Sequence, residues 1–229
     1  MKVLVVAGLQ RECRLLAGPG IETLAGGGDS ARLEEEAARL AAGVDGIVSL
    51  GIAGGLAPGL SAGDWVVADA VVDRGTTVAT DAGWTARLAA ALPEARRGPV
   101  LGQDGVAATA AEKAALHRAT GALAVDMESH VAARVARRHG RPFAVARVLS
   151  DGADRTLPPA ARVGLGADGA VDLAAVLRSL AAAPWQLPAL LRTGLEAGRA
   201  FRALEWFAST SKRSCFYFGS ADLQVRSSS

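Results

Sequence analysis

Residues 124–129, Ala124-Val-Asp-Met-Glu-Ser129, and residues 147–151, Arg147-Val-Leu-Ser-Asp151, are two apolar, strand-like runs that each lead into a carboxylate. A carboxylate at the end of a buried strand costs free energy unless a partner or a ligand binds it. A glycine-rich segment, Gly51-Ile-Ala-Gly-Gly55, follows a third apolar run and predicts a turn there. The three strand ends together predict a ligand pocket on one edge of a sheet.

Short apolar runs alternate with helical patterns along the first 150 residues. The apolar runs predict strands at residues 3–7, 46–50, 64–72, 99–102, 122–125 and 142–149. The helical patterns lie at residues 30–42, 84–92, 110–120 and 127–139. Strands that alternate with helices are typical of an α/β sheet with helices on both faces, which is the fold class we predict.

The composition excludes several classes of protein. Of the 229 residues, 50% are hydrophobic and 21% are charged, and the formal net charge is +2, which is typical of a globular chain. The first 170 residues contain no Lys/Arg cluster, so we expect no nucleic-acid partner. Cys13 and Cys215 fit neither a metal-binding spacing nor a disulfide framework, so we expect no metal site. No run is long enough to span a bilayer, and we expect a cytoplasmic protein.

The character of the sequence changes near residue 180. We predict a main domain over residues 1–180 and a C-terminal helical extension with an irregular tail over residues 181–229. Between residues 186 and 206, leucine and phenylalanine side chains share one arc of a helix. This arc favours docking on the protein's own body or on a second subunit. The alternative is contact with a membrane surface.

Three acidic residues fall just beyond predicted strands. Glu12 follows the first strand, Glu128 follows the strand at residues 122–125, and Asp151 follows the strand at residues 142–149. Ligands of open α/β sheets sit beyond the carboxyl ends of the strands. Each acid alone is equally consistent with a helix cap, a role that Asp126 also suits. Their coincidence favours a binding or catalytic site.

Four motifs now give the pattern a family resemblance. They are Gly51-Ile-Ala-Gly-Gly-Leu-Ala-Pro58, Gly63-Asp-Trp-Val-Val67, Ala124-Val-Asp-Met-Glu128 and Ser150-Asp-Gly-Ala-Asp154. In order and spacing they resemble the nucleoside phosphorylase and nucleosidase superfamily, and best the branch that contains methylthioadenosine nucleosidase. The resemblance implies a three-layer sandwich with a central twisted mixed sheet. It also implies that the chain assembles into homo-oligomers.

Three further segments narrow the resemblance. They are Gly26-Gly-Gly-Asp-Ser-Ala-Arg-Leu33, Leu157-Pro-Pro-Ala-Ala161 and Leu173-Ala-Ala-Val-Leu-Arg-Ser-Leu180. They are similar to the hopanoid-associated phosphorylase family, which implies release of adenine from adenosylhopane during hopanoid side-chain biosynthesis. A lipid-like substrate partitions into bilayers. The C-terminal helix would then contact the inner membrane peripherally.

The resemblance implies a role for each candidate residue. Asp151 matches the general acid that protonates the departing purine, and Glu12 matches the residue that activates water. Glu128 matches the carboxylate that accepts hydrogen bonds from the ribose hydroxyls, and Met127 would pack on the sugar. Ser150 and the backbone of Gly54 and Gly55 would line the pocket.

Three positions depart from the family pattern. Ser49 stands where phosphorylases carry a phosphate-binding arginine, and Arg11 is the alternative anchor for phosphate. Val106 and Ala107 stand where an aromatic side chain would stack on adenine, which implies a different or looser pocket. Phosphorolysis, with inorganic phosphate as co-substrate, and hydrolysis therefore both stay open. No other cofactor is expected.

Two alternatives remain beside the adenosylhopane reading. One is a methylthioadenosine or adenosylhomocysteine nucleosidase, which needs the same catalytic residues. The other is a nucleoside-binding module without catalysis. That module would keep the fold and lose the acid, and the presence of Asp151 counts against it.

Overall fold

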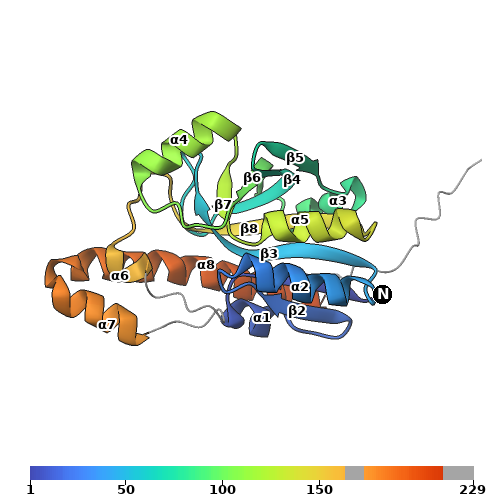
Figure 1. The fold of residues 1–229 in the computed structure, drawn as a ribbon, viewed down its shortest axis with the longest axis horizontal. Coiled ribbons are helices and arrows are strands. Elements are labelled where there is room, and N and C mark those ends of the chain that lie inside the picture. Colours follow the sequence, from blue (N-terminus) through green and yellow to red (C-terminus); the bar gives the residue numbers. More distant parts are fainter. Residues whose placement is uncertain (163–172, 214–229) are drawn as a thin grey trace, which may run out of the picture.

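The computed structural model describes residues 1–162 and 173–213, and its strands form one mixed sheet (Figure 1). The strands are β1 (Val3–Ala7), β2 (Ile21–Ala25), β3 (Gly46–Gly55), β4 (Trp65–Asp73), β5 (Thr76–Ala79), β6 (Arg96–Gly102), β7 (Ala124–Asp126) and β8 (Phe143–Asp151). β3 pairs in parallel with β1 and β8, and it pairs antiparallel with β7. The predicted α/β fold with a mixed sheet is confirmed.

Helices cover both faces of this sheet. They are α1 (Gln10–Leu16), α2 (Ser30–Ala41), α3 (Ala82–Ala91), α4 (Ala110–Thr120), α5 (Ser129–Arg138), α6 (Pro159–Arg162), α7 (Leu173–Ala182), the 3₁₀ turn η1 (Pro184–Gln186) and α8 (Leu187–Arg213). The apolar sides of α2 and α5 pack on one face of the sheet. The apolar sides of α1, α3 and α8 pack on the other face. The result is three layers, with α4 over β6 and β7 at one end.

The middle of the sheet closes on itself. β3 pairs with β7, β7 with β6, β6 with β4, β4 with β8, and β8 again with β3. β2 and β1 extend the sheet from β3, and β5 extends it from β4. The closure brings the carboxyl ends of β3, β7 and β8 to one place.

The predicted turn at Gly51 is wrong. β3 continues through Gly55, because β8 offers a hydrogen-bonding partner along this whole length, from Ile47 opposite Phe143 to Gly54 opposite Asp151. The register shifts between Ala53 and Gly54, so the irregularity comes at the end of the strand. Sequence periodicity also missed α1, β2 and β5, which are short or half-exposed.

The second half of α8 packs into the main body. Phe201, Leu204 and Phe207 are buried, and the Phe207 ring lies 5.4 Å from that of Trp65, measured between centroids. The predicted docking on the protein's own body holds for this half. The first half keeps Leu191 and Leu195 exposed. Among the described residues, no helix has the length and apolarity that a bilayer span requires. Contact between α8 and a membrane surface stays a prediction.

Gly46→Ala is expected to destabilise the fold by about 1–3 kcal/mol, because a Cβ there would lie 2.6 Å from Cζ2 of Trp84 in α3. The indole is itself buried, so a shift away from the new methyl group would disturb its own packing. Gly43→Ala is the matched control, since its nearest atom would be Leu40 O at 3.7 Å. Urea unfolding measures both variants. Equal stability of the two would contradict the packing argument.

Candidate active site

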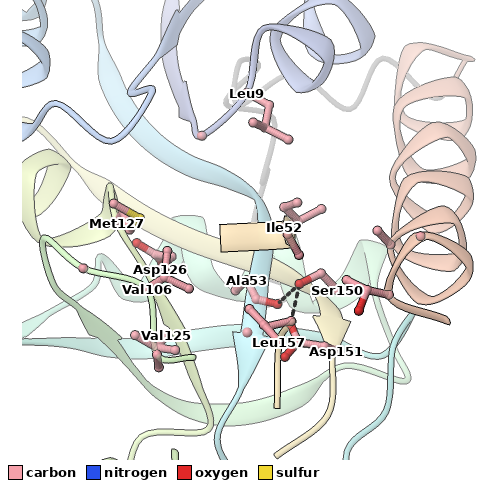
Figure 2. Close-up of a pocket in the computed structure, with 18 of the residues that line it drawn as sticks. Leu9, Ile52, Ala53, Val106, Val125, Asp126, Met127, Ser150, Asp151 and Leu157 are labelled. Atoms are coloured by element: carbon pink, nitrogen blue, oxygen red, sulfur yellow. Dashed lines mark hydrogen bonds between the residues drawn. The ribbon is translucent and has the colours of Figure 1, made fainter. Parts of the chain in front are cut away.

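A cavity of about 510 Å³ opens where β3, β7 and β8 end (Figure 2). This volume lies within the range of about 300–1,000 Å³ that is usual for small-molecule sites. Its wall is mostly apolar, with three carboxyl-bearing residues, Asp126, Glu128 and Asp151. α7 and α8 close one side through Val176 and Leu190. The cavity is therefore an apolar pocket with a few acidic groups at one edge of the sheet.

Asp151 ends β8 and is 3% exposed. Its Oδ2 pairs with the ammonium of Lys113, and its Oδ1 accepts a hydrogen bond from Ser150 Oγ at 2.7 Å. Ser150 Oγ also lies 3.1 Å from Ala53 O, so its single proton serves one acceptor at a time. The carboxyl group is thus held from two sides at the cavity wall.

Arg147 lies two residues before the end of β8's apolar run and is fully buried. It shares a face of the strand with Val145 and Leu149, because side chains of a strand alternate. Its Nε lies 2.9 Å from Asp126 Oδ2, and its Nη2 lies 3.4 Å from Glu128 Oε2. The buried guanidinium therefore serves two carboxylates of the cavity.

Two serines complete the coordination of Arg147. Nη2 donates to Ser49 Oγ at 2.5 Å and to Ser129 Oγ at 3.2 Å. Ser129 Oγ in turn donates to Asp126 Oδ2 or to Ser49 Oγ. Asp126 Oδ1 accepts the backbone N–H groups of Glu128 and Ser129. The N-cap position of α5 is Glu128 rather than Asp126, so Asp126 supports the start of the helix from two residues before that cap.

Glu12, on α1, is fully buried next to the cavity and is not part of its wall. Its carboxylate accepts the backbone N–H groups of Leu9 at 2.6 Å and Ile52 at 2.5 Å. Burial raises the pKa of Glu12, while these N–H groups and the charge of Arg147 oppose the rise. A buried carboxylate with a raised pKa is suited to accept a proton near neutral pH.

Glu128 lies close to Glu12. A Cβ on Gly8 would be 3.2 Å from Glu128 Oε1 and 3.3 Å from Glu12 Oε2, so the two carboxylates border the same point. Burial raises the pKa of Glu128 to about 8. The charge of Arg147 lowers this pKa, and the charges of Asp126 and Glu12 raise it.

Glycines make room for these carboxylates. A Cβ on Gly51 would lie 2.5 Å from Glu12 Oε1 and 3.1 Å from Arg147 Nη1, and one on Gly26 would lie 2.7 Å from Glu128 Cγ. The sequence predicts a turn at the glycine-rich segment. In the structure the glycine at position 51 instead leaves the space that the buried carboxylate and guanidinium occupy.

The cavity wall contains six of the nine predicted site residues. These six are Gly54, Val106, Met127, Glu128, Ser150 and Asp151. Glu12 lies behind the wall. Gly55 is not in the wall either, because its Cα faces the backbone of Asp151, where a Cβ would lie 2.8 Å from the carbonyl oxygen. The roles assigned to all of these residues stay predictions.

Arg11 does not reach the cavity. Its Nη2 lies 3.2 Å from Glu205 Oε1 of α8, and its guanidinium carbon lies 4.0 Å above the centre of the Phe201 ring. The structure therefore does not support Arg11 as the anchor for phosphate. Glu205, between Leu204 and Trp206 on α8, thus has a cationic partner.

Two residues were missed as parts of the site. Arg147 stands in an otherwise apolar strand run, and a charge in a buried strand is a recognisable signal of a polar partner. Lys113 gave no such signal. It stands in a helix beside Glu112, where a lysine is normally solvated, and only the tertiary contact with Asp151 reveals its role.

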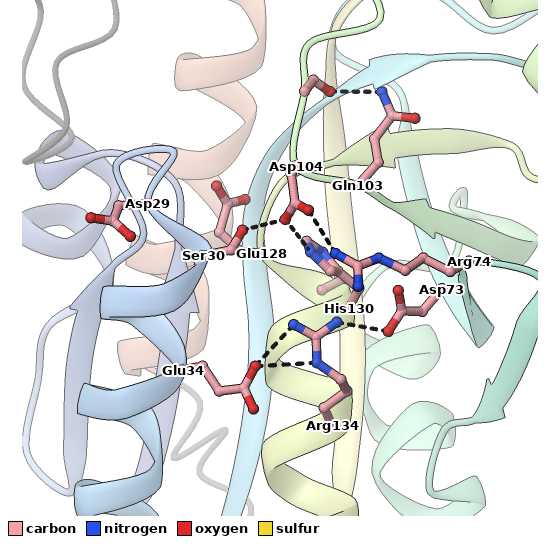
Figure 3. Close-up of polar contacts among 12 residues, drawn as sticks. Asp29, Ser30, Glu34, Asp73, Arg74, Gln103, Asp104, Glu128, His130 and Arg134 are labelled. Carbon is pink, nitrogen blue, oxygen red and sulfur yellow. Dashed lines mark hydrogen bonds and ion pairs between the residues drawn. The ribbon is translucent and has the colours of Figure 1, made fainter.

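A polar network outside the cavity anchors the loop that follows β6 (Figure 3). Asp104 accepts hydrogen bonds from Ser30 Oγ at 2.6 Å and from Arg74 Nη2 at 3.0 Å, and it lies 3.0 Å from His130 Nε2. The hydrogen bond from Ser30, with those from His130 and Arg74, holds the pKa of Asp104 well below its usual range. The next residues, Gly105 and Val106, line the cavity, so the network fixes one of its walls.

No aromatic side chain lines the cavity among the described residues. Val106 is 41% exposed, and Ala107 beside it is buried. Both lie in the wall where an aromatic residue was expected to stack on a base. The described wall offers a ligand aliphatic contacts and hydrogen-bonding groups instead. The aliphatic side chains at these two positions agree with the departure of Val106 and Ala107 from the family pattern in the sequence.

The chain is similar to a known protein family and to one curated protein. A family model described as the phosphorylase superfamily matches residues 5–182. Futalosine hydrolase from Streptomyces coelicolor is 39% identical over 124 residues, which cover 46% of this chain and 53% of that protein. The matched segment therefore spans about half the length of this curated relative.

Solved structures share the fold at low identity. The S-adenosylhomocysteine nucleosidase from Streptococcus pyogenes, in complex with a methylthio-tubercidin ligand, is 20% identical with a TM-score of 0.64, over 92% of this chain and 97% of that chain. A futalosine hydrolase mutant from Helicobacter pylori is 19% identical with a TM-score of 0.57, over 65% of this chain and 89% of that chain. At these identities the likeness shows the fold alone.

Proposed function

The chain belongs to the phosphorylase superfamily, and from this premise we propose that it cleaves the N-glycosidic bond of an adenosyl-type nucleoside by hydrolysis. The superfamily predicted from the sequence motifs is confirmed, and the hopanoid-associated branch stays a prediction. The observation that carries the proposal is a set of three buried carboxylates at one apolar cavity: Glu128 and Asp151 in its wall, and Glu12 directly behind the wall.

The three carboxylates divide the chemistry between them. Asp151 donates its proton to the departing purine, while Glu128 accepts hydrogen bonds from the ribose hydroxyls. Glu12 takes a proton from a water molecule, and the water oxygen forms the new bond to the anomeric carbon as the bond to the purine nitrogen breaks. The raised pKa of Glu12 supports this assignment, because a base of ordinary acidity holds a proton weakly near neutral pH.

The charges around the cavity favour water over phosphate as the second reactant. A phosphate dianion needs cationic partners, usually arginine. Among the described residues, no lysine or arginine lines the cavity. The nearby cations Arg147 and Lys113 are each paired with carboxylates. These contacts leave a phosphate ion without a charge to bind.

The shape of the cavity supports a substrate with an apolar 5′ substituent. Val176 and Leu190 close its side at α7 and α8, and exposed leucines of α8 continue beyond it. Adenosylhopane, the substrate that the sequence resemblance implies, suits such a wall. Futalosine is the second candidate, and the 39% identity to the Streptomyces futalosine hydrolase supports it.

Release of the base is expected to proceed equally fast with and without inorganic phosphate, and the sugar product is expected to be free rather than phosphorylated. The assay runs on adenosylhopane, methylthioadenosine, adenosylhomocysteine and futalosine in parallel, with chromatography of base and sugar. A strict requirement for phosphate, with a sugar 1-phosphate product, would overturn the hydrolytic proposal. Binding of all four nucleosides without release of any base would leave a binding module as the function.

A further inference from the structure

Lys113, on α4, is fully buried, yet it does not line the cavity. Its ammonium pairs with Asp151 Oδ2 and donates to Gly152 O at 3.0 Å. Lysine is rarely this buried unless it is paired, because removing its charge from water costs several kcal/mol by order of magnitude. The ammonium therefore lies behind the carboxyl group that the cavity presents.

Lys113 binds one carboxylate oxygen of Asp151 and leaves the other, Oδ1, on the side of the cavity. Oδ2 is occupied by Lys113, and Oδ1 receives Ser150 Oγ at 2.7 Å on the side of the cavity. Both Ser150 and Asp151 are part of the cavity wall. In the proposed step Oδ1 carries the proton, so Ser150 Oγ turns its own proton to Ala53 O and leaves Oδ1 aimed at the ligand. The lysine fixes that orientation from the opposite side.

The start of α4 does not need Lys113. Thr109 Oγ1 accepts the N–H of Glu112, and Glu112 Oε2 accepts the N–H of Ala108, so the helix has its own reciprocal cap. An apolar side chain would join α4 to β8 with less desolvation than a buried ion pair. The contact with the Asp151 carboxylate therefore explains a lysine at position 113 better than helix packing does.

Other charged groups around the pair have partners elsewhere. On α4, His117 Nδ1 lies 2.8 Å from Ala122 O, and Glu112 is engaged in the helix cap. In the segment after β8, Arg155 pairs with Glu196 of α8, and Asp154 is exposed beside Gly152. Across the cavity, Glu128 faces Arg147. Asp151 is the one ion-pair partner recorded for Lys113 in residues 1–162 and 173–213.

We propose that Lys113 is the positioning residue of Asp151: it orients the carboxyl group toward the departing base and balances the charge that proton donation creates. The inference rests on the proposed function. When Asp151 gives its Oδ1 proton to the purine, the O–H bond breaks and the carboxylate keeps the electron pair. The new negative charge forms in contact with the ammonium, so the step does not leave an isolated buried charge.

Lys113→Met is expected to lower kcat for base release by roughly 10- to 100-fold with little change in KM, since a charge-assisted hydrogen bond to the acid is lost. A purely structural lysine would change the amount of folded enzyme and leave kcat per folded enzyme at the parental value.

Three matched variants complete the test. Lys113→Arg keeps the charge and is expected to keep kcat close to the parental value. Lys113→Gln keeps a donor without the charge, so it carries the same test where the methionine variant fails to fold. Lys113→Met combined with Asp151→Asn is expected to regain stability in urea unfolding without regaining turnover, because neither charge remains buried alone.

Two results would overturn the role of Lys113. One is a parental kcat in the folded methionine or glutamine variant, and the other is an equal loss of kcat in the arginine variant. Failure of the proposed function looks different, because the parental enzyme would then release no base from any nucleoside tested. An active parent with an unchanged kcat in the variants contradicts the lysine proposal alone.

Discussion

Asp151→Asn is expected to lower kcat for base release about 10³-fold while KM stays within a few-fold of the parental value. Asparagine has the shape of the acid but holds no ionisable proton. Its amide still offers an oxygen to Lys113 and a polar group to Ser150, so the wall of the cavity keeps its form. Substrate binding should therefore survive where proton donation does not. A purine leaves poorly without a proton, which places the loss on kcat.

Steady-state kinetics with detection of free base measure the effect, and circular dichroism shows whether the variant is folded. Asp69→Asn is the matched control, because Asp69 is exposed on β4 and away from the cavity. The control should have parental kinetics. A variant at position 151 with at least a tenth of the parental kcat would remove Asp151 as the acid.

The sequence predicted the parts of this site that depend on strand ends. Apolar runs identified β1, β3 and β8, and the acids that follow strands came together because the closed part of the sheet joins the ends of β3, β7 and β8. Local pattern did not predict the continuation of β3 through Gly55, since the hydrogen bonds that extend it come from β8, about 90 residues later in the chain.

Partners of the acids were harder to predict than the acids. Lys113 and Asp151 lie 38 positions apart, and nothing in the helix around Lys113 marks it as buried. Arg11 shows the opposite error: adjacency to the first strand suggested the cavity, but α8 supplies Glu205 and Phe201 on the other side. Side-chain direction depends on neighbours that only the tertiary structure brings together.

Arg147 supplies the counter-charge for the buried carboxyl groups at the edge of the cavity. Asp126 and Glu128 pair with it, and its charge also acts on Glu12, so three buried carboxyl groups share one guanidinium. All three cannot be ionised at low cost, and burial raises the pKa of Glu128 to about 8. The folded state then binds a proton that the unfolded state has lost. Stability contributed by this group should fall as pH rises from about 4.5 to about 8.

Arg147→Met is expected to destabilise the protein by about 3–5 kcal/mol at neutral pH, because it leaves buried carboxylates without their counter-charge. Methionine fills much of the volume of the arginine stem, so lost packing is a small part of the effect. The loss should shrink as pH falls toward 5, since protonated carboxyl groups no longer need a cation. Urea unfolding at several pH values measures both expectations.

Two comparisons decide whether the charge is the cause. Arg192→Met removes an exposed guanidinium that pairs with Glu196 on α8, and it should cost less than about 1 kcal/mol. Adding Asp126→Asn to Arg147→Met should recover part of the stability, because the carboxylate whose Oδ2 lies 2.9 Å from Arg147 Nε becomes neutral. Recovery of stability without recovery of turnover would show that two effects are separate. One is the stability of the buried acids, and the other is their proposed contact with the sugar. A loss in Arg147→Met no larger than in the exposed control would contradict this account of the cluster.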